Sequence, residues 1–362
     1  MLDGLPESPQ FARALARLSQ IEMLKQQPHA IETAEKAIAV ARRVDDSFAD
    51  VNARINIFTQ RSTEGVPPDP DEVVAIIDAA VEAGEYEEGY RAIVNFIWSI
   101  AGFLSIERTE EVVAQAQARL ADVPAPRSIG PYLEISIAWA LLVPTGRWAE
   151  ADDLVERLRD AEHGATMMLV ALGVEGGLAM RRGEPKAAQV FEVLRPLALE
   201  SGEPQRIIPM AAVVAPWFAS TGDREALRSL LEDILETLDD EWPSSLDSVP
   251  IVRALAAAGE TALLRRTTES IRRSRALAAK SRTAVLAGQG LVALEDGRAE
   301  EAVELLARAA ERERSLGRTY DATVLELDLA RALEAAGNES GADEARSRAE
   351  AFLQPLDVVN AF

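Results

Sequence analysis

The sequence predicts an all-α protein, and more specifically an α-solenoid of about nine helix-turn-helix repeats. Its 362 residues are 48% hydrophobic, 27% charged and only 5% aromatic, which favours helices over aromatic-rich sheets. Apolar residues recur at helical spacing, as in Phe11, Leu15 and Leu18. Glycines mark turns at nearly equal intervals along the chain, and this spacing is typical of repeat architectures.

The turn markers are six glycines separated by 37, 39, 37, 38 and 40 residues: Gly146, Gly183, Gly222, Gly259, Gly297 and Gly337. Most are followed by a polar start and then an alanine-rich or apolar stretch. Glycine adopts the left-handed conformation that ends a helix, and acidic residues in the next first turn suit the positive end of a helix dipole. Each marker therefore predicts the turn between two helices of one repeat.

Moving the same frame upstream by about 40 residues at a time reaches three further turns, at residues 104–108, at Glu64 and Gly65, and at residues 25–28. The frame then holds nine helix pairs of about 39 residues in one domain, residues 1–362. The expected pairs span residues 9–45, 48–83, 86–121, 127–161, 164–200, 205–239, 245–280, 281–316 and 319–355.

A column of uncharged residues supports the frame. Seven residues before the successive turns stand Leu18, Phe58, Trp98, Trp139, Gly176, Ala215, Val252, Gly290 and Ala330. We expect this column to be a packing position, with Trp98 and Trp139 in the core. Small residues there allow neighbouring helices to approach closely.

Composition excludes several classes of function. The chain has no cysteine and only two histidines, which removes disulfides, thiolate sites and most imidazole catalysis, so we expect no enzyme activity, no cofactor and no metal. A net charge of −22 makes the chain as a whole repel nucleic acid and anionic membranes. With no long apolar run and no signal peptide in the sequence, we expect a cytoplasmic location.

Three stretches carry a resemblance to a known family. They are Gly84-Glu-Tyr-Glu-Glu-Gly-Tyr-Arg-Ala-Ile-Val-Asn-Phe96, residues 137–151 around Ala-Trp-Ala-Leu-Leu-Val-Pro-Thr-Gly-Arg-Trp, and Leu316-Gly-Arg-Thr-Tyr-Asp-Ala322 followed by residues 327–333. They resemble the tetratricopeptide-like repeats of bacterial LuxR-type regulators with an ATPase module and of related adenylate cyclases. The resemblance implies tetratricopeptide-like repeats in a right-handed superhelix. Because the period near 39 exceeds the 34 residues of the standard repeat, HEAT-like or other helical pairs stay open.

The resemblance also implies a regulatory role, since the helical array of that family is inferred to bind an inducer or partner and to restrain an effector module. Two family features are missing from the sequence: a Gly-x-x-x-x-Gly-Lys-Ser/Thr phosphate loop and a DNA-reading helix-turn-helix after the last repeat. We therefore expect the sensor or scaffold part of such a regulator, or a stand-alone relative. The family's nucleotide chemistry does not carry over.

Seven basic residues between positions 265 and 282 are opposed only by Glu269. This basic stripe consists of Arg265, Arg266, Arg272, Arg273, Arg275, Lys280 and Arg282. Such a stripe could bind nucleic acid or a phosphorylated partner. The alternative, which we favour, is ion pairing with the acidic residues of the preceding repeat, Glu232, Asp233, Glu236, Asp239, Asp240 and Glu241.

Helix-breaking residues gather in the middle of the array: Gly164, Gly173, Gly176, Gly177, Pro209 and Pro216. Interior glycine costs about 1 kcal/mol relative to alanine and interior proline about 3 kcal/mol, so a compensating feature is expected. One hypothesis is a bend or ligand pocket on the concave face. Its candidate binding residues are Tyr132, Met167, Met168, Arg181, Trp217 and Phe218. The alternative, again favoured, is close helix packing with a tolerated kink.

The sequence predicts a non-catalytic module that binds its partner in a concave groove, because solenoid grooves bind extended ligands over several repeats. A protein or peptide is the first expected partner and a small-molecule inducer the second. Nucleic acid is the alternative, through the basic stripe, and no membrane partner is expected. The sequence predicts neither the identity of the ligand nor the oligomeric state.

Overall fold

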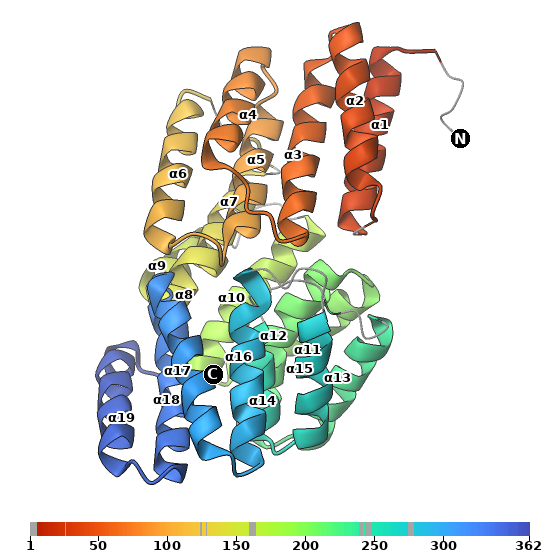
Figure 1. Cartoon of the computed structure of the whole chain (residues 1–362). Coiled ribbons are helices and arrows are strands. Elements are labelled where there is room, and N and C mark those ends of the chain that lie inside the picture. Colours follow the sequence, from red (N-terminus) through yellow and green to blue (C-terminus); the bar gives the residue numbers. More distant parts are fainter. Residues whose placement is uncertain are drawn as a thin grey trace. The chain divides into compact units, whose positions relative to one another are not determined.

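A computed structural model describes residues 6–25, 27–123, 125–127, 129–158, 164–238, 242, 248–273 and 279–362, except for the side chains of residues 165, 279 and 280. Within these ranges the chain is all-helical and contains no strand, apart from one isolated bridge between Ala101 and Leu104. Figure 1 shows the helices in chain order. The all-α prediction is confirmed.

The chain divides into two compact units, Met1–Ile137 and Ala138–Phe362, and each is described by itself. Unit 1 contains α1 (Pro9–Leu24), α2 (Ala30–Val44), α3 (Ser47–Thr63), α4 (Pro70–Ala83), α5 (Tyr86–Ile100), α6 (Ile106–Arg119) and α7 (Gly130–Ile137). The expectation of a single domain over residues 1–362 stays a prediction.

Unit 2 begins with the π-helix η1 (Ala138–Leu142) and the short helix α8 (Val143–Thr145). It continues with α9 (Trp148–Leu158), α10 (Ala165–Arg181), α11 (Lys186–Glu200), α12 (Pro204–Thr221), α13 (Arg224–Thr237), α14 (Ser248–Ala257) and α15 (Thr261–Arg273). The last elements are α16 (Ala279–Glu295), α17 (Ala299–Ser315), α18 (Thr319–Ala335), α19 (Glu339–Leu353) and the 3₁₀-helix η2 (Gln354–Leu356).

Helices pack mainly against their neighbours in the chain and against the next helix but one. In unit 1, α1 packs on both α2 and α3, and α3 packs on α5. In unit 2, α10, α12, α14 and α16 pack on one another in succession, with α11, α13, α15 and α17 beside them. The first helices of the pairs thus form one layer and the second helices another, as expected for an α-solenoid.

All six glycine markers lie in turns after a helix. Their φ angles fall between 67° and 84°, in the left-handed region that residues with a Cβ rarely adopt. Gly222, for example, is the C-cap of α12, and Asp223 then caps α13 by accepting a hydrogen bond from the Ala226 N–H. The predicted turns are therefore confirmed at the glycine markers.

The packing column is buried at Phe58, Ala215, Val252 and Ala330. Trp98 and Trp139 are only half-buried, so the expected core position is met in part. Leu18 is 37% exposed, and there the prediction was wrong. Leu18 lies on α1, the first described helix, where no preceding repeat among the described residues covers that face.

Close helix packing explains the glycines inside α10. A Cβ built on Gly176 would lie 2.5 Å from Cε1 of Phe191 and 2.9 Å from Cγ1 of Val190, and one on Gly173 would collide with the Trp139 ring. Pro209 and Pro216 lie within α12, which continues from Pro204 to Thr221. These contacts support the packing alternative over a pocket formed by broken helices.

We expect Gly176→Ala to lower the free energy of unfolding by up to about 2 kcal/mol, because the added methyl group overpacks the contact with Phe191 at a cost of about 1–3 kcal/mol. A gain of about 1 kcal/mol in helix propensity offsets part of this cost. Gly89→Ala in α5 is the matched control, since its new Cβ would meet Leu120 at an ordinary 3.4 Å, and it should be neutral or stabilising. Urea unfolding followed by circular dichroism measures both, and equal effects would contradict the packing explanation.

Candidate functional site

The candidate residues from the middle of the array do not form one pocket. Met167 is buried and Met168 half-buried near the start of α10, whereas Arg181 is the last residue of that helix. At a rise of about 1.5 Å per residue, roughly 20 Å of helix separates them. Only Arg181 lies on the inner surface described below.

Trp217 and Phe218 lie near the end of α12 and contact α11. The Trp217 ring lies 6.0 Å from the Phe191 ring, and the Arg195 guanidinium lies 5.9 Å from the centre of the Phe218 ring. Both are half-buried side chains that pack against the core of unit 2. Tyr132 belongs to α7 of unit 1, where its carbonyl oxygen accepts a hydrogen bond from Ser136.

Arg181 connects two distant repeats of unit 2. Its Nε donates a hydrogen bond to the Tyr320 hydroxyl over 3.2 Å, and its guanidinium lies 5.1 Å from the centre of the Tyr320 ring. The centres of the Tyr320 and Trp148 rings lie 5.0 Å apart in a T-shaped arrangement. Trp148 is the first residue of α9, and Tyr320 lies in the first turn of α18. The first and last helix pairs of unit 2 are therefore in contact, and the unit closes on itself.

A second buried connection joins α14 to α18. Nε of Arg253 lies 2.5 Å from Oδ2 of Asp328, and both side chains are at least nine-tenths buried. Arg331 approaches the other carboxylate oxygen at 3.6 Å. We call the surface formed by Arg181, Arg253, Tyr320 and Asp328 the inner surface of unit 2.

The last six residues of the chain lie on this inner surface. Asp357 adopts a left-handed conformation that ends η2, and the chain then runs past the end of α10. The backbone N–H groups of Val359 and Asn360 donate to the Arg181 carbonyl oxygen over 2.8 and 3.0 Å, and the Asn360 side chain donates to the Met180 carbonyl. The last carbonyl groups of a helix receive no hydrogen bond from N–H groups of the same helix. The tail supplies donors to two such carbonyl groups at the end of α10.

Side chains of α14 and α18 hold the final two residues of the tail. Nη1 of Arg253 donates to the Ala361 carbonyl over 3.0 Å, and the Tyr320 hydroxyl donates to the Phe362 carbonyl over 2.9 Å. The Phe362 ring packs against the core, with the Arg253 guanidinium 5.9 Å from its centre. Figure 1 marks the C-terminus among the helices of unit 2.

The protonation state of Tyr320 suits this arrangement. Burial raises the pKa of the phenol, although the nearby Arg181 and Arg253 guanidinium groups lower it. The hydroxyl group therefore stays protonated at neutral pH, so that it can accept from Arg181 and donate to Phe362 at the same time. Tyr320 falls within the stretch that carries the family resemblance, but sequence reasoning did not identify it as a site residue.

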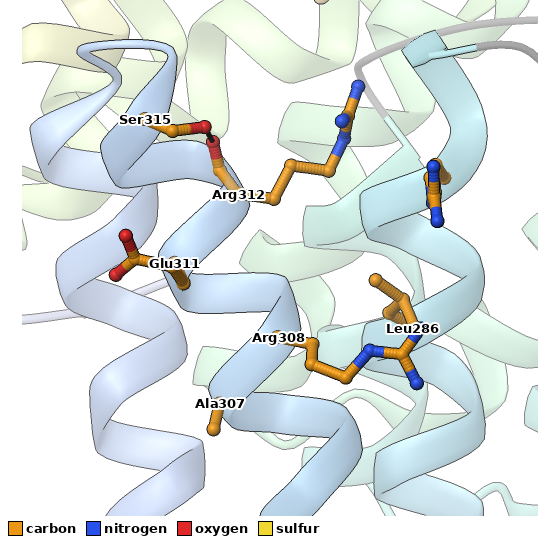
Figure 2. Close-up of a pocket in the computed structure, with 7 residues that line it drawn as sticks. Leu286, Ala307, Arg308, Glu311, Arg312 and Ser315 are labelled. Carbon is orange, nitrogen blue, oxygen red and sulfur yellow. Dashed lines mark hydrogen bonds between the residues drawn. The ribbon is translucent and has the colours of Figure 1, made fainter.

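A pocket lies between α16 and α17, with a volume of about 510 Å³ (Figure 2). We call it the arginine pocket, because three guanidinium groups line it. Its lining residues are Arg282, Leu286, Ala307, Arg308, Glu311, Arg312 and Ser315. Arg282 belongs to the basic stripe, whereas Arg308 and Arg312 escaped sequence reasoning because acidic residues surround them along α17.

The remainder of the basic stripe is largely paired. Arg265 forms an ion pair with Asp296 of the following repeat, and Arg272 and Arg273 pair with Glu269 of their own helix. Pairing of these three residues with the preceding repeat stays a prediction. Arg275 and the Lys280 side chain lie outside the described residues, as do Asp239, Asp240 and Glu241.

A buried hydrogen-bond network joins the first helices of unit 1. Nδ2 of Asn56 lies within hydrogen-bond distance of the Ala16 carbonyl oxygen (3.1 Å) and of Ser19 Oγ (2.8 Å), and Asn56 Oδ1 accepts from Arg91. Arg91 also donates to Glu88 over 2.6 Å. Burial lowers the pKa of the Arg91 guanidinium, and the Glu88 carboxylate opposes that shift. We call this set the unit 1 network.

The described part of the chain meets neither the requirements of a metal site nor those of a membrane-spanning helix. No group of three or more histidine or carboxylate side chains there could hold a metal ion. Among the helices of the described residues, none is both long and apolar enough to cross a membrane. Comparison with protein-family models and with curated proteins finds no match for this chain.

Proposed function

We propose that the protein is a non-catalytic regulatory module that binds an extended peptide segment of a partner protein on the inner surface of unit 2. The observation that carries this proposal is the placement of residues 357–362, which occupy that surface as a bound peptide would. Their backbone groups meet the end of α10, Arg253 and Tyr320. The tail of the protein thus occupies the surface on which the partner peptide would bind.

The contacts suit a peptide better than a compact small molecule. Four of the hydrogen bonds described above engage backbone N–H or carbonyl groups of the tail, and such bonds provide affinity for any extended chain. Selectivity would come from two tail side chains: Asn360, which donates to the Met180 carbonyl of α10, and Phe362, whose ring lies beside Arg253. A partner segment with an aromatic residue at the last position fits this surface best.

We further propose that the helix pairs are tetratricopeptide-like, that they form a right-handed superhelix, and that the module serves a bacterial transcriptional regulator or signalling cyclase. Support comes from the regular helix pairs and from the stretches that resemble that family. A small inducer on the same surface would be an alternative ligand. Nucleic-acid binding through the basic stripe has less support, because Arg265, Arg272 and Arg273 form ion pairs.

The test is a chain that ends at residue 356 together with a labelled peptide of residues 354–362, acetylated and amidated. We expect the shortened chain to bind the peptide in fluorescence anisotropy, and the full chain to bind it at least tenfold more weakly. The reason is that an attached segment competes at an effective concentration in the millimolar range.

The control peptide replaces Phe362 with alanine and should bind more weakly than the parent peptide. Circular dichroism establishes that the shortened chain remains folded. A folded shortened chain that binds neither peptide would contradict the proposal, as would equal binding by the full and shortened chains.

A further inference from the structure

The arginine pocket lies apart from the tail and is formed by two helices that face each other. Arg308 and Arg312 stand four residues apart on α17, on one face of that helix, and Arg282 comes from α16. Figure 2 shows the side chains of Arg308 and Arg312 extending from α17 toward α16, with Leu286 beside Arg308. The pocket is a groove that is open to solvent, and its volume of about 510 Å³ is large enough for a small organic anion.

The pocket concentrates positive charge in a chain whose net charge is −22. Three guanidinium groups and one carboxylate, Glu311, line it. Glu311 forms an ion pair of 2.5 Å with Arg314, which does not line the pocket. Arg308 also contacts Glu304, at a longer distance of 3.4 Å, and both side chains are more than half exposed. Such an exposed ion pair is weak, so Glu304 neutralises little of the positive charge of the pocket.

Electrostatics inside the pocket favours an anion. Burial lowers the pKa of the Arg312 guanidinium, Glu313 raises it, and the positive charge of Arg282 lowers it again. Arg282 and Arg312 are thus close enough to repel each other. A negative group placed between them would relieve this repulsion and gain charge-assisted hydrogen bonds.

We propose that the arginine pocket binds a small organic phosphate, with its phosphate group held by Arg282, Arg308 and Arg312 and its apolar part on Leu286 and Ala307. Guanidinium groups bind phosphate oxygens through paired N–H donors, and three of them match a doubly charged group. The apolar residues in the lining favour a ligand that is more than inorganic phosphate. This site is independent of the peptide surface proposed above.

The probe is phenyl phosphate, titrated into the full chain by isothermal calorimetry at low salt. We expect saturable binding, with inorganic phosphate at least tenfold weaker because it lacks the apolar part. Arg282→Gln and Arg308→Gln should each weaken phenyl phosphate tenfold or more, because each removes a charge-assisted hydrogen bond. Both side chains are exposed, so these variants should fold normally.

The matched control is Arg346→Gln in α19, which removes the same charge from an arginine of unit 2 outside the pocket. It should bind phenyl phosphate as the unchanged protein does. An equal loss in Arg346→Gln and Arg308→Gln would show a general charge effect and overturn the proposal. So would the absence of phenyl phosphate binding at millimolar concentration, or equal binding of inorganic phosphate, which would remove the role of Leu286 and Ala307.

Discussion

Asp328→Ala is expected to lower the free energy of unfolding by about 3–5 kcal/mol, the largest effect of any single substitution considered for this protein. The substitution leaves the Arg253 guanidinium buried without its carboxylate, since only 6% of Arg253 is exposed. Keeping a charge buried without a partner is costly, because the charge loses its hydration and gains no ion pair in return. Unfolding in urea, followed by tryptophan fluorescence, measures the loss, because four of the five tryptophans belong to unit 2.

Two further variants separate the ion pair from simple packing. Asp328→Asn keeps an acceptor oxygen for Arg253 and should cost less than Asp328→Ala. Replacing both partners with apolar residues, as in Arg253→Met with Asp328→Leu, should recover much of the stability, because no buried charge then remains. If the double variant is as unstable as Asp328→Ala, the buried charge is not the cause.

Asn56→Leu is expected to cost about 3 kcal/mol, although leucine and asparagine are similar in size. Asn56 is only 1% exposed and forms the centre of the unit 1 network. Its loss leaves Ser19 and Arg91 each without one buried hydrogen-bond partner, and each unsatisfied buried group costs about 1–3 kcal/mol. Urea unfolding of the full chain, followed by circular dichroism, measures the effect.

The control is the same substitution at Asn95 on α5. This side chain is half-buried, and its amide donates one hydrogen bond, to Thr59 over 3.1 Å. Asn95→Leu should therefore cost only about 0.5–1.5 kcal/mol, the typical net value of a single hydrogen bond. Equal losses at Asn56 and Asn95 would mean that the network adds nothing beyond individual bonds.

The helices and their turns were predictable because they depend on local physics. Gly222 must adopt a positive φ to end α12, and Asp223 can cap the next helix only from that position. The repeat frame likewise predicted the buried column positions Phe58, Ala215, Val252 and Ala330, whereas Trp98 and Trp139 in the same column are only half-buried. At Leu18 the same rule failed, because burial requires a neighbouring helix as well as an apolar residue.

A π-helix in unit 2 was not predicted, although a residue in the sequence accounts for it. The chain forms a π-helix at Ala138–Leu142 immediately before α8. Pro144 has no backbone N–H and cannot donate to the carbonyl of Ala140, so a regular helix cannot continue without a missing bond. Tetratricopeptide-like repeats predict a plain helix at this point.

The candidate sites were predictable only in part. Arg181 and Arg282 stood among the sequence candidates, and the structure places each at a site proposed here. Their partners were not found, because Tyr320 is 139 residues away from Arg181 and the pocket depends on how α17 faces α16. Met167, Trp217 and Phe218 were chosen for residue type, and the structure assigns them to helix packing.

The amino-acid sequence alone determined where helices begin and end, because capping, glycine conformation and helical periodicity act over a few residues. Only the tertiary structure decided that the first and last pairs of unit 2 meet, that Arg253 and Asp328 are buried together, and that residues 357–362 lie on the inner surface. These contacts join residues 42 to 180 positions apart. They depend on the small rotation from each repeat to the next, which accumulates over many packed helices and which no local pattern encodes.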